Sequence, residues 1–295
     1  MKKISVIINC HNGEKYLDQC LKSILNQKYK NIEIIFFDNL SSDNSKNIIR
    51  NFSDERIKFF SSKKKLSLYH ARNQAIDYAS GELIAFLDVD DWWDVNYLSS
   101  RETIFNNNKY DIFYNNVLFF YEKNNKFKKY KNYTLPNGKI YDYLAKDYFI
   151  IISGSIIRKK VFDKVGKFNS KFNIIGDYDF MMRASKICNF HGLNEPLIYY
   201  RVHQNNFSKK NTDIFYKEFY SWYLDQSEIN DEDFLKNREY FTKRLLFLEI
   251  NHLLLNKRKN FLVFKKILKY PNILQMFKFI IGFMLPKKII KLIKN

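Results

Sequence analysis

Three aspartates, Asp88, Asp90 and Asp91, directly follow the uninterrupted apolar run from Leu83 to Leu87. Such a run is typical of a strand buried on both faces of a parallel sheet, and open α/β sheets bind ligands at the carboxyl ends of their strands. Carboxylates this close together repel one another unless a cation lies between them. Because Mg²⁺ and Mn²⁺ prefer oxygen ligands and commonly hold substrate phosphates, the pattern indicates a metal-assisted phosphate site. On this motif alone a solvated acidic turn is the more common explanation, and it is the rest of the chain that favours the metal site.

A further aspartate, Asp38, follows a second segment that we expect to be a buried strand, Ile32 to Phe37. Both runs would end at the same edge of one sheet. At that edge Asp38 could hydrogen-bond a nucleotide base and Asp88 a ribose hydroxyl. Asp90 would then hold a metal that bridges a diphosphate.

Two nearby polar residues are open to more than one interpretation. Asp43 stands directly before a helical stretch, and we favour a helix cap over a ligand contact there. Arg72 lies in the helix that leads to the central strand. An arginine near an anion site can form charge-assisted hydrogen bonds, and the alternative is a solvated helical face.

Short apolar runs alternate with stretches of helical periodicity in the first part of the chain, which predicts an α/β fold with a parallel sheet and helices on its faces. We expect strands at Ile4–Ile8, Ile32–Phe37, Ile57–Phe60 and Leu83–Leu87. We expect helices at Glu14–Asn26, from the cap residues at 41–44 to Asn51, and at Leu68–Ala79.

The pattern changes after Asp94, where aromatic and helical segments alternate less regularly. We expect a helix at Asn96–Asn107, a strand at Asp111–Tyr121, a hairpin tip or loop at Lys123–Lys131, partly helical segments at Ile156–Val165 and Asp177–Cys188, and a strand at Leu197–Val202. From about Thr212 the chain reads as helices to its end. The predicted organisation is therefore a catalytic domain at 1–211 and a helical region at 212–295.

Composition bounds the class of protein. The 295 residues include 46% hydrophobic residues, 28 Phe and 21 Tyr, which excludes a disordered chain. The three cysteines have no metal-site spacing and are typical of thiols in a reducing compartment. The apolar run after the basic N-terminus breaks at Asn9, so no secretory signal is visible, and we expect a cytoplasmic protein.

Positive charge is concentrated in the tail. The formal net charge is +19, and Lys236 to Asn295 accounts for +13 of it, with 15 basic and 2 acidic residues. The longest apolar stretch there, Ile273 to Leu285, has 13 residues, whereas a membrane span needs about 20. A basic amphipathic segment lying on an anionic membrane surface fits better, with Pro271 and Pro286 dividing it into short helices. The alternative is that these helices pack on the catalytic domain.

Five segments carry a family resemblance: SVIINCHNGEKYL, IEIIFFDNLSSDNS, HARNQAIDYASGELIAFLDVDDWW, FNIIGDYDFMMRAS and YRVHQNNFS. They cover roughly Ile4 to Ser208, and in this order they resemble the family-2 glycosyltransferases of bacterial surface-polysaccharide synthesis. The resemblance implies the GT-A fold, with a Rossmann-like, mostly parallel sheet. It also implies transfer of a sugar from a nucleotide sugar, commonly a UDP-sugar, with inversion at the anomeric carbon.

The resemblance also implies roles for residues at the matching positions. Asp38 matches the family's base-contacting acid, and Asp88 and Asp90 match its Asp-x-Asp pair, with Asp90 as the main metal ligand. His203 matches a histidine in a loop that closes over the diphosphate and can join the metal, although a lone histidine beside a strand is more often structural. The other residues expected to contact the nucleotide sugar are Asn12, Asn39, Arg72 and Arg183. The expected cofactor is Mn²⁺ or Mg²⁺.

The catalytic base is expected at Asp177, which matches the aspartate of the family's Glu-Asp motif, with Arg183 six residues later. Such a base is needed because the acceptor hydroxyl must lose its proton as it attacks the anomeric carbon. Asp179 is the competing candidate. Residues two apart on a helix point to different faces, so only one of them should reach the acceptor, and we favour Asp177.

The chain departs from the family pattern at several positions. Gly176 stands where the family usually has Glu, so any support that this acid gives the base is missing. Asn39 replaces a commoner Asp, and Asn9-Cys10-His11 replaces a more usual Pro-Thr-Tyr. Trp92 and Trp93 could shape the acceptor pocket or simply pack in the core.

The sequence therefore predicts a metal-dependent inverting glycosyltransferase that uses a nucleotide sugar, commonly UDP-linked. Its acceptor would be a glycan or lipid-linked glycan, and its location the inner face of the cytoplasmic membrane. One alternative is a basic nucleic-acid-binding protein, which leaves the acidic strand ends unexplained because they would repel phosphates, so no nucleic-acid partner is expected. Another is a catalytically silent assembly partner of the same fold.

Overall fold

The computed structural model describes residues 1–256 and 261–284. The chain divides into two compact units, Met1–Gln204 and Asn205–Asn295. The predicted boundary lay at 211, a few residues further along the chain.

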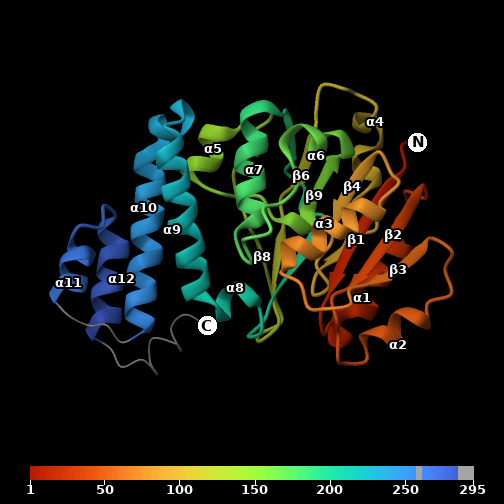
Figure 1. The fold of residues 1–295 in the computed structure, drawn as a ribbon, viewed down its shortest axis with the longest axis horizontal. Coiled ribbons are helices and arrows are strands. Elements are labelled where there is room, and N and C mark those ends of the chain that lie inside the picture. Colours follow the sequence, from red (N-terminus) through yellow and green to blue (C-terminus); the bar gives the residue numbers. More distant parts are fainter. Residues whose placement is uncertain (257–260, 285–295) are drawn as a thin grey trace. The chain divides into compact units, whose positions relative to one another are not determined.

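The first unit is built on a mostly parallel sheet of seven strands in the order β10-β6-β9-β4-β1-β2-β3 (Figure 1). The strands are β1 (Ile4–Cys10), β2 (Ile32–Asp38), β3 (Ile57–Ser61), β4 (Leu83–Phe86), β6 (Ile112–Asn115), β9 (Ser155–Arg158) and β10 (Phe190–Leu193). Only β9 runs antiparallel to its neighbours, β4 and β6. The predicted α/β class with a mostly parallel sheet is confirmed.

Helices cover both faces of this sheet, which explains why its central strands are apolar without alternation. On one face the apolar side of α1 packs against alternate residues of β1 and β2. On the other face α3 contacts the same two strands. The helices of this unit are α1 (Glu14–Leu25), α2 (Ser45–Arg50), α3 (Leu68–Tyr78), α4 (Glu102–Phe105), α5 (Tyr141–Lys146), α6 (Lys159–Val165) and α7 (Gly176–Ile187).

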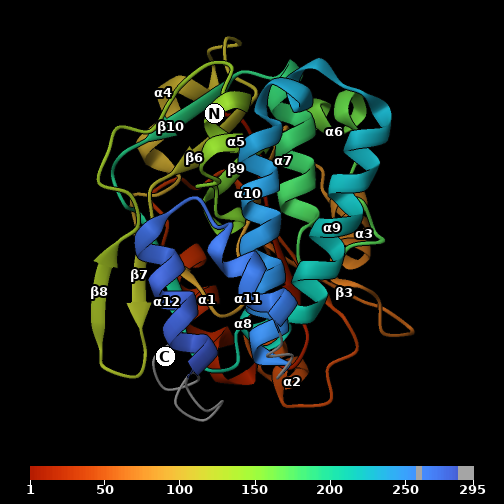
Figure 2. The same ribbon diagram turned by 90° about the vertical axis from the view of Figure 1, so that its left-hand side faces the viewer.

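A second, smaller sheet has four strands in the order β5-β11-β7-β8. Its strands are β5 (Trp92–Trp93), β7 (Leu118–Tyr121), β8 (Lys126–Lys129) and β11 (Ile198–Val202). Figure 2 shows β7 and β8 as an antiparallel pair. The hairpin tip expected at Lys123–Lys131 is therefore confined to the turn at 122–125, and Lys126–Lys129 form a strand instead. The rings of Trp92 and Tyr199 stack with their centroids 5.0 Å apart, so Trp92 packs within this sheet.

Two predicted elements are wrong in detail, and a third, Ile156–Val165, is partly helical as expected but includes a strand. The expected strand at Asp111–Tyr121 is two strands, β6 and β7, which belong to different sheets. The segment Ile156–Val165 begins inside the antiparallel strand β9 and becomes helix α6 only at Lys159. The expected helix at Asn96–Asn107 is reduced to a 3₁₀ turn at Ser99–Arg101 followed by the short α4.

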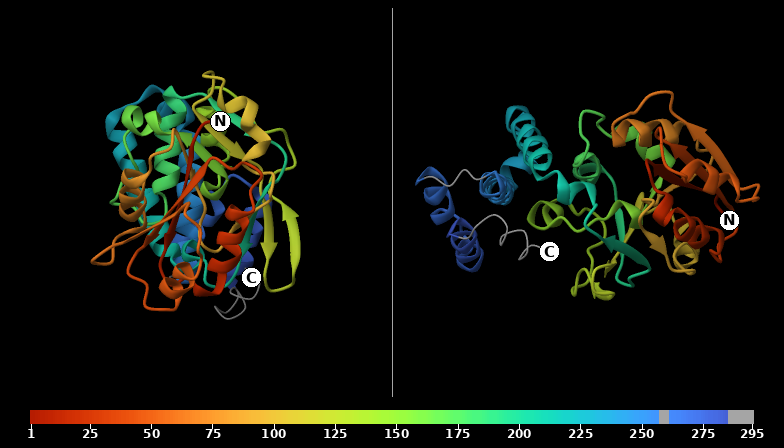
Figure 3. Two further views of the ribbon diagram at one scale, coloured as in Figure 1. Left: turned by 90° about the vertical axis from the view of Figure 1, so that its right-hand side faces the viewer. Right: turned by 90° about the horizontal axis from the view of Figure 1, so that it is seen from below.

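The second unit is helical, as predicted. Its helices are α8 (Phe207–Lys210), α9 (Thr212–Ile229), α10 (Glu232–Leu255), α11 (Phe261–Leu268) and α12 (Ile273–Met284). Figures 1 and 3 show α11 and α12 side by side, and these two helices share a small apolar core with α10. Pro271 lies between α11 and α12, as expected, whereas Pro286 lies outside the described residues. No helix within the described ranges is long and apolar enough to cross a bilayer.

Candidate active site

The register of the large sheet brings the two predicted acidic strand ends to one edge. Cys10 at the end of β1 pairs with Asp38 at the end of β2, and Ile7 of β1 pairs with Phe86 of β4. Asp88 therefore follows β4 at about the level where β1 and β2 end. This is the carboxyl edge at which parallel sheets bind ligands.

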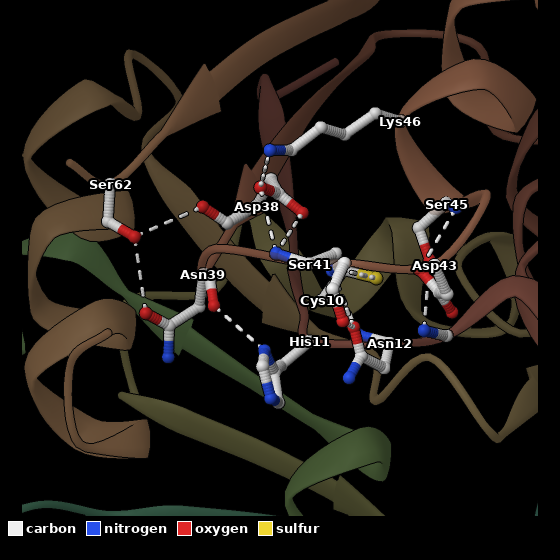
Figure 4. Close-up of polar contacts among 12 residues, drawn as sticks. Cys10, His11, Asn12, Asp38, Asn39, Ser41, Asp43, Ser45, Lys46 and Ser62 are labelled. Carbon is white, nitrogen blue, oxygen red and sulfur yellow. Dashed lines mark hydrogen bonds and ion pairs between the residues drawn. The ribbon is translucent and has the colours of Figure 1, made fainter. Parts of the chain in front are cut away.

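Asp38 is fully buried and holds the turn that follows β2 (Figure 4). Its carboxylate accepts the backbone N–H of Ser41 at 3.2 and 3.3 Å and lies 3.5 Å from the Lys46 ammonium. In this turn Leu40 has a backbone φ of 58°, a left-handed conformation that leucine rarely adopts. The Asp38 contacts stabilise this backbone.

The side chains of Asn39 and Asn12 also form hydrogen bonds with the loops at this edge of the sheet. The Asn39 side chain accepts the N–H of Leu66 at 2.9 Å and donates to its carbonyl at 3.0 Å, so it ties the loop before α3 to β2. Asn12 has a φ of 58° and accepts the N–H of Ser42 at 2.8 Å. Asp43 accepts the backbone N–H groups of Glu14 and Ser45, the first residues of α1 and α2, although the N-cap positions themselves are Gly13 and Asn44.

Asp88 forms an ion pair with Arg72, which α3 carries. The Arg72 side chain is only 2% exposed, so it lies inside the protein and is not on a solvated helical face. Burial alone would lower the pKa of this guanidinium, but the neighbouring Asp88 carboxylate raises it, so Arg72 remains a cation.

Asp90 lies next to His203, which follows β11. Its carboxylate oxygen Oδ2 is 2.9 Å from His203 Nε2. The neighbouring Arg201 donates its Nε–H to the Asp90 carbonyl at 2.9 Å, and its guanidinium lies over the ring of Trp92, 4.5 Å from the centroid. Arg201 of β11 and His203, which follows it, therefore both hold the acidic turn after β4.

Asp91 is the buried member of the acidic turn. It accepts the Ser153 hydroxyl at 2.6 Å and the N–H of Arg201 at 2.9 Å. Burial raises the pKa of Asp91 well above its ordinary value. Asp91, Ser153 and Arg201 therefore support the turn, and the sequence showed only that Asp91 belongs to an acidic cluster.

Asp177 begins α7 and faces Tyr69 of α3. The Tyr69 hydroxyl donates to Asp177 Oδ1 at 2.8 Å, and the N–H of Tyr178 donates to the same oxygen at 2.9 Å. Burial raises the pKa of the Asp177 carboxyl above its ordinary value, while the nearby Arg72 cation opposes the rise. Asp88, Arg72, Tyr69 and Asp177 thus form a continuous series of neighbours, since the Arg72 guanidinium lies 5.2 Å from the centroid of the Tyr69 ring.

Asp179 has a different environment. Its carboxylate accepts two hydrogen bonds from Arg183, at 2.9 and 3.0 Å, one turn further along α7. Arg183 also donates to the carbonyls of Val165 and Lys167 at 2.6 and 3.0 Å. The Asp179–Arg183 pair therefore fastens the loop after α6 to α7. The expected donor contact of Arg183 stays a prediction.

Comparison with known proteins identifies the family. Residues 5–166, more than half of the chain, match the family model described as Glycosyl transferase family 2. An Escherichia coli protein named UDP-Glc:alpha-D-GlcNAc-diphosphoundecaprenol beta-1,3-glucosyltransferase is 31% identical over 227 residues, which cover 70% of this chain and 80% of that protein. Other glycosyltransferases match at 37 to 42% identity but over less than half of their own length. The chain belongs to glycosyl transferase family 2.

Solved structures agree with the fold of this family 2 glycosyltransferase. Staphylococcus aureus TarS in complex with UDP-GlcNAc superimposes with a TM-score of 0.61 at 17% identity, over 85% of this chain and 72% of that one. The mannosyltransferase PcManGT of Pyrobaculum calidifontis, in complex with GDP-Man and Mn²⁺, gives 0.58 at 13% identity, over 84% and 72%. The fold is therefore GT-A.

The residues of the glycosyltransferase fit a divalent metal in donor type and spacing. Among the described residues no group of three or more His, Cys, Asp or Glu side chains is arranged to hold a metal. Asp90 and His203 offer an oxygen and a nitrogen 2.9 Å apart. Neighbouring ligands of an octahedral ion at about 2.1 Å would be about 3 Å apart, and Mg²⁺-type sites often use one or two protein ligands plus substrate phosphates. These two residues could therefore hold the ion once a diphosphate completes its coordination.

Proposed function

We propose that this family 2 glycosyltransferase moves a sugar, with inversion and with the help of a divalent metal, from a UDP-linked nucleotide sugar to a hydroxyl of a glycan or lipid-linked glycan in surface-polysaccharide synthesis. The observation that carries the proposal is the series of contacts from Asp88 through Arg72 and Tyr69 to Asp177. It connects an acid on the expected donor side with an acid that can serve as a base.

The donor would lie along the carboxyl edge of the sheet. Asp38 is fully buried, so it would contact the nucleotide base only after the turn that follows β2 shifts. Its carboxylate has lone pairs beyond those that Ser41 and Lys46 use. Asp88 would accept a ribose hydroxyl. Arg72 is a buried cation beside it and favours a negatively charged ligand there. Asn12 and Asn39 would hold the loops that surround the base.

Asp90 and His203 would hold Mn²⁺ or Mg²⁺. When bound, such an ion neutralises the diphosphate and stabilises the negative charge that develops as this group leaves. The Asp90–His203 contact joins the turn after β4 to the segment after β11. Asp91 and Arg201 would keep that turn in place through their buried hydrogen bonds.

Asp177 would act as the general base. It would accept the proton of the acceptor hydroxyl while the hydroxyl oxygen forms a bond to the anomeric carbon and the bond to the diphosphate oxygen breaks. Attack from the face opposite the leaving group inverts the anomeric carbon. Asp177 suits this role better than Asp179 because Asp179 is engaged by Arg183, whereas Asp177 has a pKa raised by burial.

A lipid-linked acceptor is supported by two observations. The E. coli relative is named for an acceptor on diphosphoundecaprenol. In addition, the last described helix of this chain, α12, exposes apolar side chains at positions that share one helical face: Ile273, Leu274, Phe277, Ile281 and Met284. The same helix carries Lys278, and the tail from Asn251 contains 11 basic side chains and no Asp or Glu. An anionic membrane surface would bind both features.

The proposal can be tested with the purified chain, UDP-glucose or UDP-N-acetylglucosamine, and a membrane extract that contains undecaprenyl-diphosphate-linked sugars. Release of UDP and extension of the lipid-linked sugar should require Mn²⁺ or Mg²⁺ and should stop when a chelator is added. Tight binding of the donor without any transfer or hydrolysis would instead favour a catalytically silent partner. Metal-independent transfer would contradict the role of the ion.

A further inference from the structure

The ring of Tyr69 lies directly against the backbone of Gly176. A Cβ atom added at Gly176 would come within 2.4 to 2.6 Å of three Tyr69 ring atoms, a distance at which one of the two residues must move. Tyr69 is only 2% exposed and has no open space into which it could retreat without disturbing its neighbours. The glycine therefore makes room for the tyrosine.

In this position the Tyr69 hydroxyl contacts the carboxylate of Asp177, the residue that follows Gly176. The hydroxyl oxygen lies 2.8 Å from Asp177 Oδ1 and 3.0 Å from the carbonyl oxygen of Ile174. The Tyr69 hydroxyl therefore contacts both the loop before α7 and the first turn of α7. The N–H of Tyr178 also reaches Oδ1, at 2.9 Å. Both of these hydrogen bonds fall on Oδ1, so neither uses the second oxygen, Oδ2, which the proposed reaction needs as the proton acceptor.

We propose that Tyr69, seated in the space left by Gly176, is a positioning residue that orients the carboxylate of the general base Asp177. This inference rests on the proposed function for its catalytic consequence. Because position 176 carries no side chain, the Tyr69 ring fits against the backbone there and its hydroxyl reaches the Asp177 carboxylate from α3.

The same helix connects the base with the donor side of the site. Tyr69 and Arg72 are three residues apart and so lie on one face of α3. Arg72 forms the ion pair with Asp88, and Tyr69 forms the hydrogen bond with Asp177. A small displacement of α3 would therefore change both ends of the site together.

The charged and titratable groups around Asp177 indicate how removal of the Tyr69 hydroxyl should change the pKa of Asp177. The titratable groups that influence it are Tyr69 and Arg72 on α3, Asp88 after β4, Tyr148 after α5 and Tyr200 on β11. Burial raises the pKa of Asp177, while Arg72 and the Tyr69 hydrogen bond oppose that rise. Removal of the hydroxyl should therefore raise the pKa further.

The test is Tyr69→Phe, which keeps the ring against Gly176 and removes only the oxygen. We expect kcat for Mn²⁺-dependent UDP release from UDP-glucose or UDP-N-acetylglucosamine to fall about 3- to 30-fold, with KM for the donor unchanged. The acidic limb of the kcat profile should move up by about half to one pH unit, the range expected for one neutral hydrogen bond. A purely structural role would not shift the limb.

Tyr148→Phe is the matched control. Its hydroxyl is buried, has no hydrogen-bond partner among the described residues, and lies close enough to influence Asp177 electrostatically. This variant should leave the profile in place. Gly176→Ala should reproduce the effect of Tyr69→Phe by displacing the ring, and the double variant should be no worse than Gly176→Ala alone.

A second measurement does not depend on turnover. The Asp177 carboxyl can be titrated by ¹³C NMR, assigned by its absence in Asp177→Asn, and its pKa should rise in Tyr69→Phe. An unchanged pKa and an unchanged kcat profile would overturn the role of Tyr69 while leaving the proposed function intact. A shifted pKa in a protein without any transferase or hydrolase activity would refute the proposed function, and the catalytic role of Tyr69 with it.

Discussion

Asp177 and Asp179 are two acids on one helix that the environment separates into different roles. Asp177 stands at the start of α7 with a tyrosine hydroxyl on one oxygen, and Asp179 is paired with Arg183 inside the same helix. Sequence reasoning expected only one of the two to face an acceptor, and it favoured Asp177 because Asp177 matches the aspartate of the family's Glu-Asp motif. The tyrosine was not anticipated, because no spacing or motif in the sequence links Tyr69 to a residue 108 positions later.

Substitution of the proposed base should separate catalysis from stability. Asp177→Asn is expected to lower kcat by about 10²- to 10⁴-fold, the usual effect of losing a general base, with donor affinity unchanged. Asp179→Asn should instead weaken the pair with Arg183 and reduce the free energy of unfolding by about 1–2 kcal/mol, with most of kcat retained. Steady-state kinetics and thermal unfolding of both variants check this. Inactivity of Asp179→Asn alone would reassign the base.

The raised pKa of Asp177 gives the direction of a pH effect. Since the base works only when ionised, kcat should fall as pH falls through this raised pKa and should be level above it. A carboxyl whose pKa is higher in the folded state destabilises folding once it is ionised, so at neutral pH Asp177→Asn should be as stable as the wild type or more stable. A profile without an acidic limb would contradict this assignment.

The sequence predicts the strands before Asp94 more accurately than the segments after it. The parallel strands β1, β2 and β4 were correctly expected because each is a short, mainly apolar segment that ends in polar residues, and helical stretches separate the three segments. The segment Asp111–Tyr121 is apolar on both sides of Asn115 and Asn116, and there the chain leaves one sheet and enters another. The buried side chain of Asn116 accepts the backbone N–H groups of Val117 and Lys131. Local periodicity does not reveal such a change of sheet.

The segment Ile156–Val165 shows the same limit. A short apolar run is compatible with a strand or a buried helix, and here its first residues pair with both β4 and β6 as the antiparallel strand β9. Pairing with these distant strands, and not the local sequence pattern, makes the first residues a strand. The candidate site was more predictable than these elements, because Asp38, Asp88 and Asp90 depend only on where β2 and β4 end.

The close packing of β1 against the start of β4 can be tested at Gly81. A Cβ atom there would lie 2.7 Å from the carbonyl of Lys3 and 2.8 Å from the N–H nitrogen of Ser5, both in the backbone. Gly81→Ala should therefore cost about 1–3 kcal/mol of stability, because backbone atoms must shift. Gly282→Ala on α12, whose nearest atom lies at 3.7 Å, is the control and should be neutral or stabilising. Equal melting temperatures for the two variants would show that this packing is looser than described.

At the scale of the whole molecule, charge and exposed apolar surface coincide in the helical C-terminal unit. Deletion of residues 256–295 removes 11 of the 50 basic residues and the exposed face of α12. The truncated chain should lose co-sedimentation with vesicles that contain anionic lipids, whereas the intact chain should bind them in a salt-sensitive way.

Two controls make this membrane test specific. Neutral phosphatidylcholine vesicles should bind the intact chain weakly, and Lys126→Glu on the exposed strand β8 should leave binding to anionic vesicles unchanged, because that lysine lies outside the tail. Unchanged binding by the truncated chain would show that the tail serves another purpose. Retained turnover of UDP-sugar in the truncated chain would confirm that the first unit remains folded.

Calorimetric titration of UDP-glucose and UDP-N-acetylglucosamine into the intact chain tests the central claim most directly. With Mn²⁺ present, one of these donors should bind at a single site, and the heat should disappear after chelation of the ion or in Asp90→Ala. Asp18→Ala, which removes an exposed carboxylate on α1, should bind as the wild type does. Equal binding with and without Mn²⁺, or unchanged affinity in Asp90→Ala, would contradict a metal-held diphosphate at the carboxyl edge of the sheet.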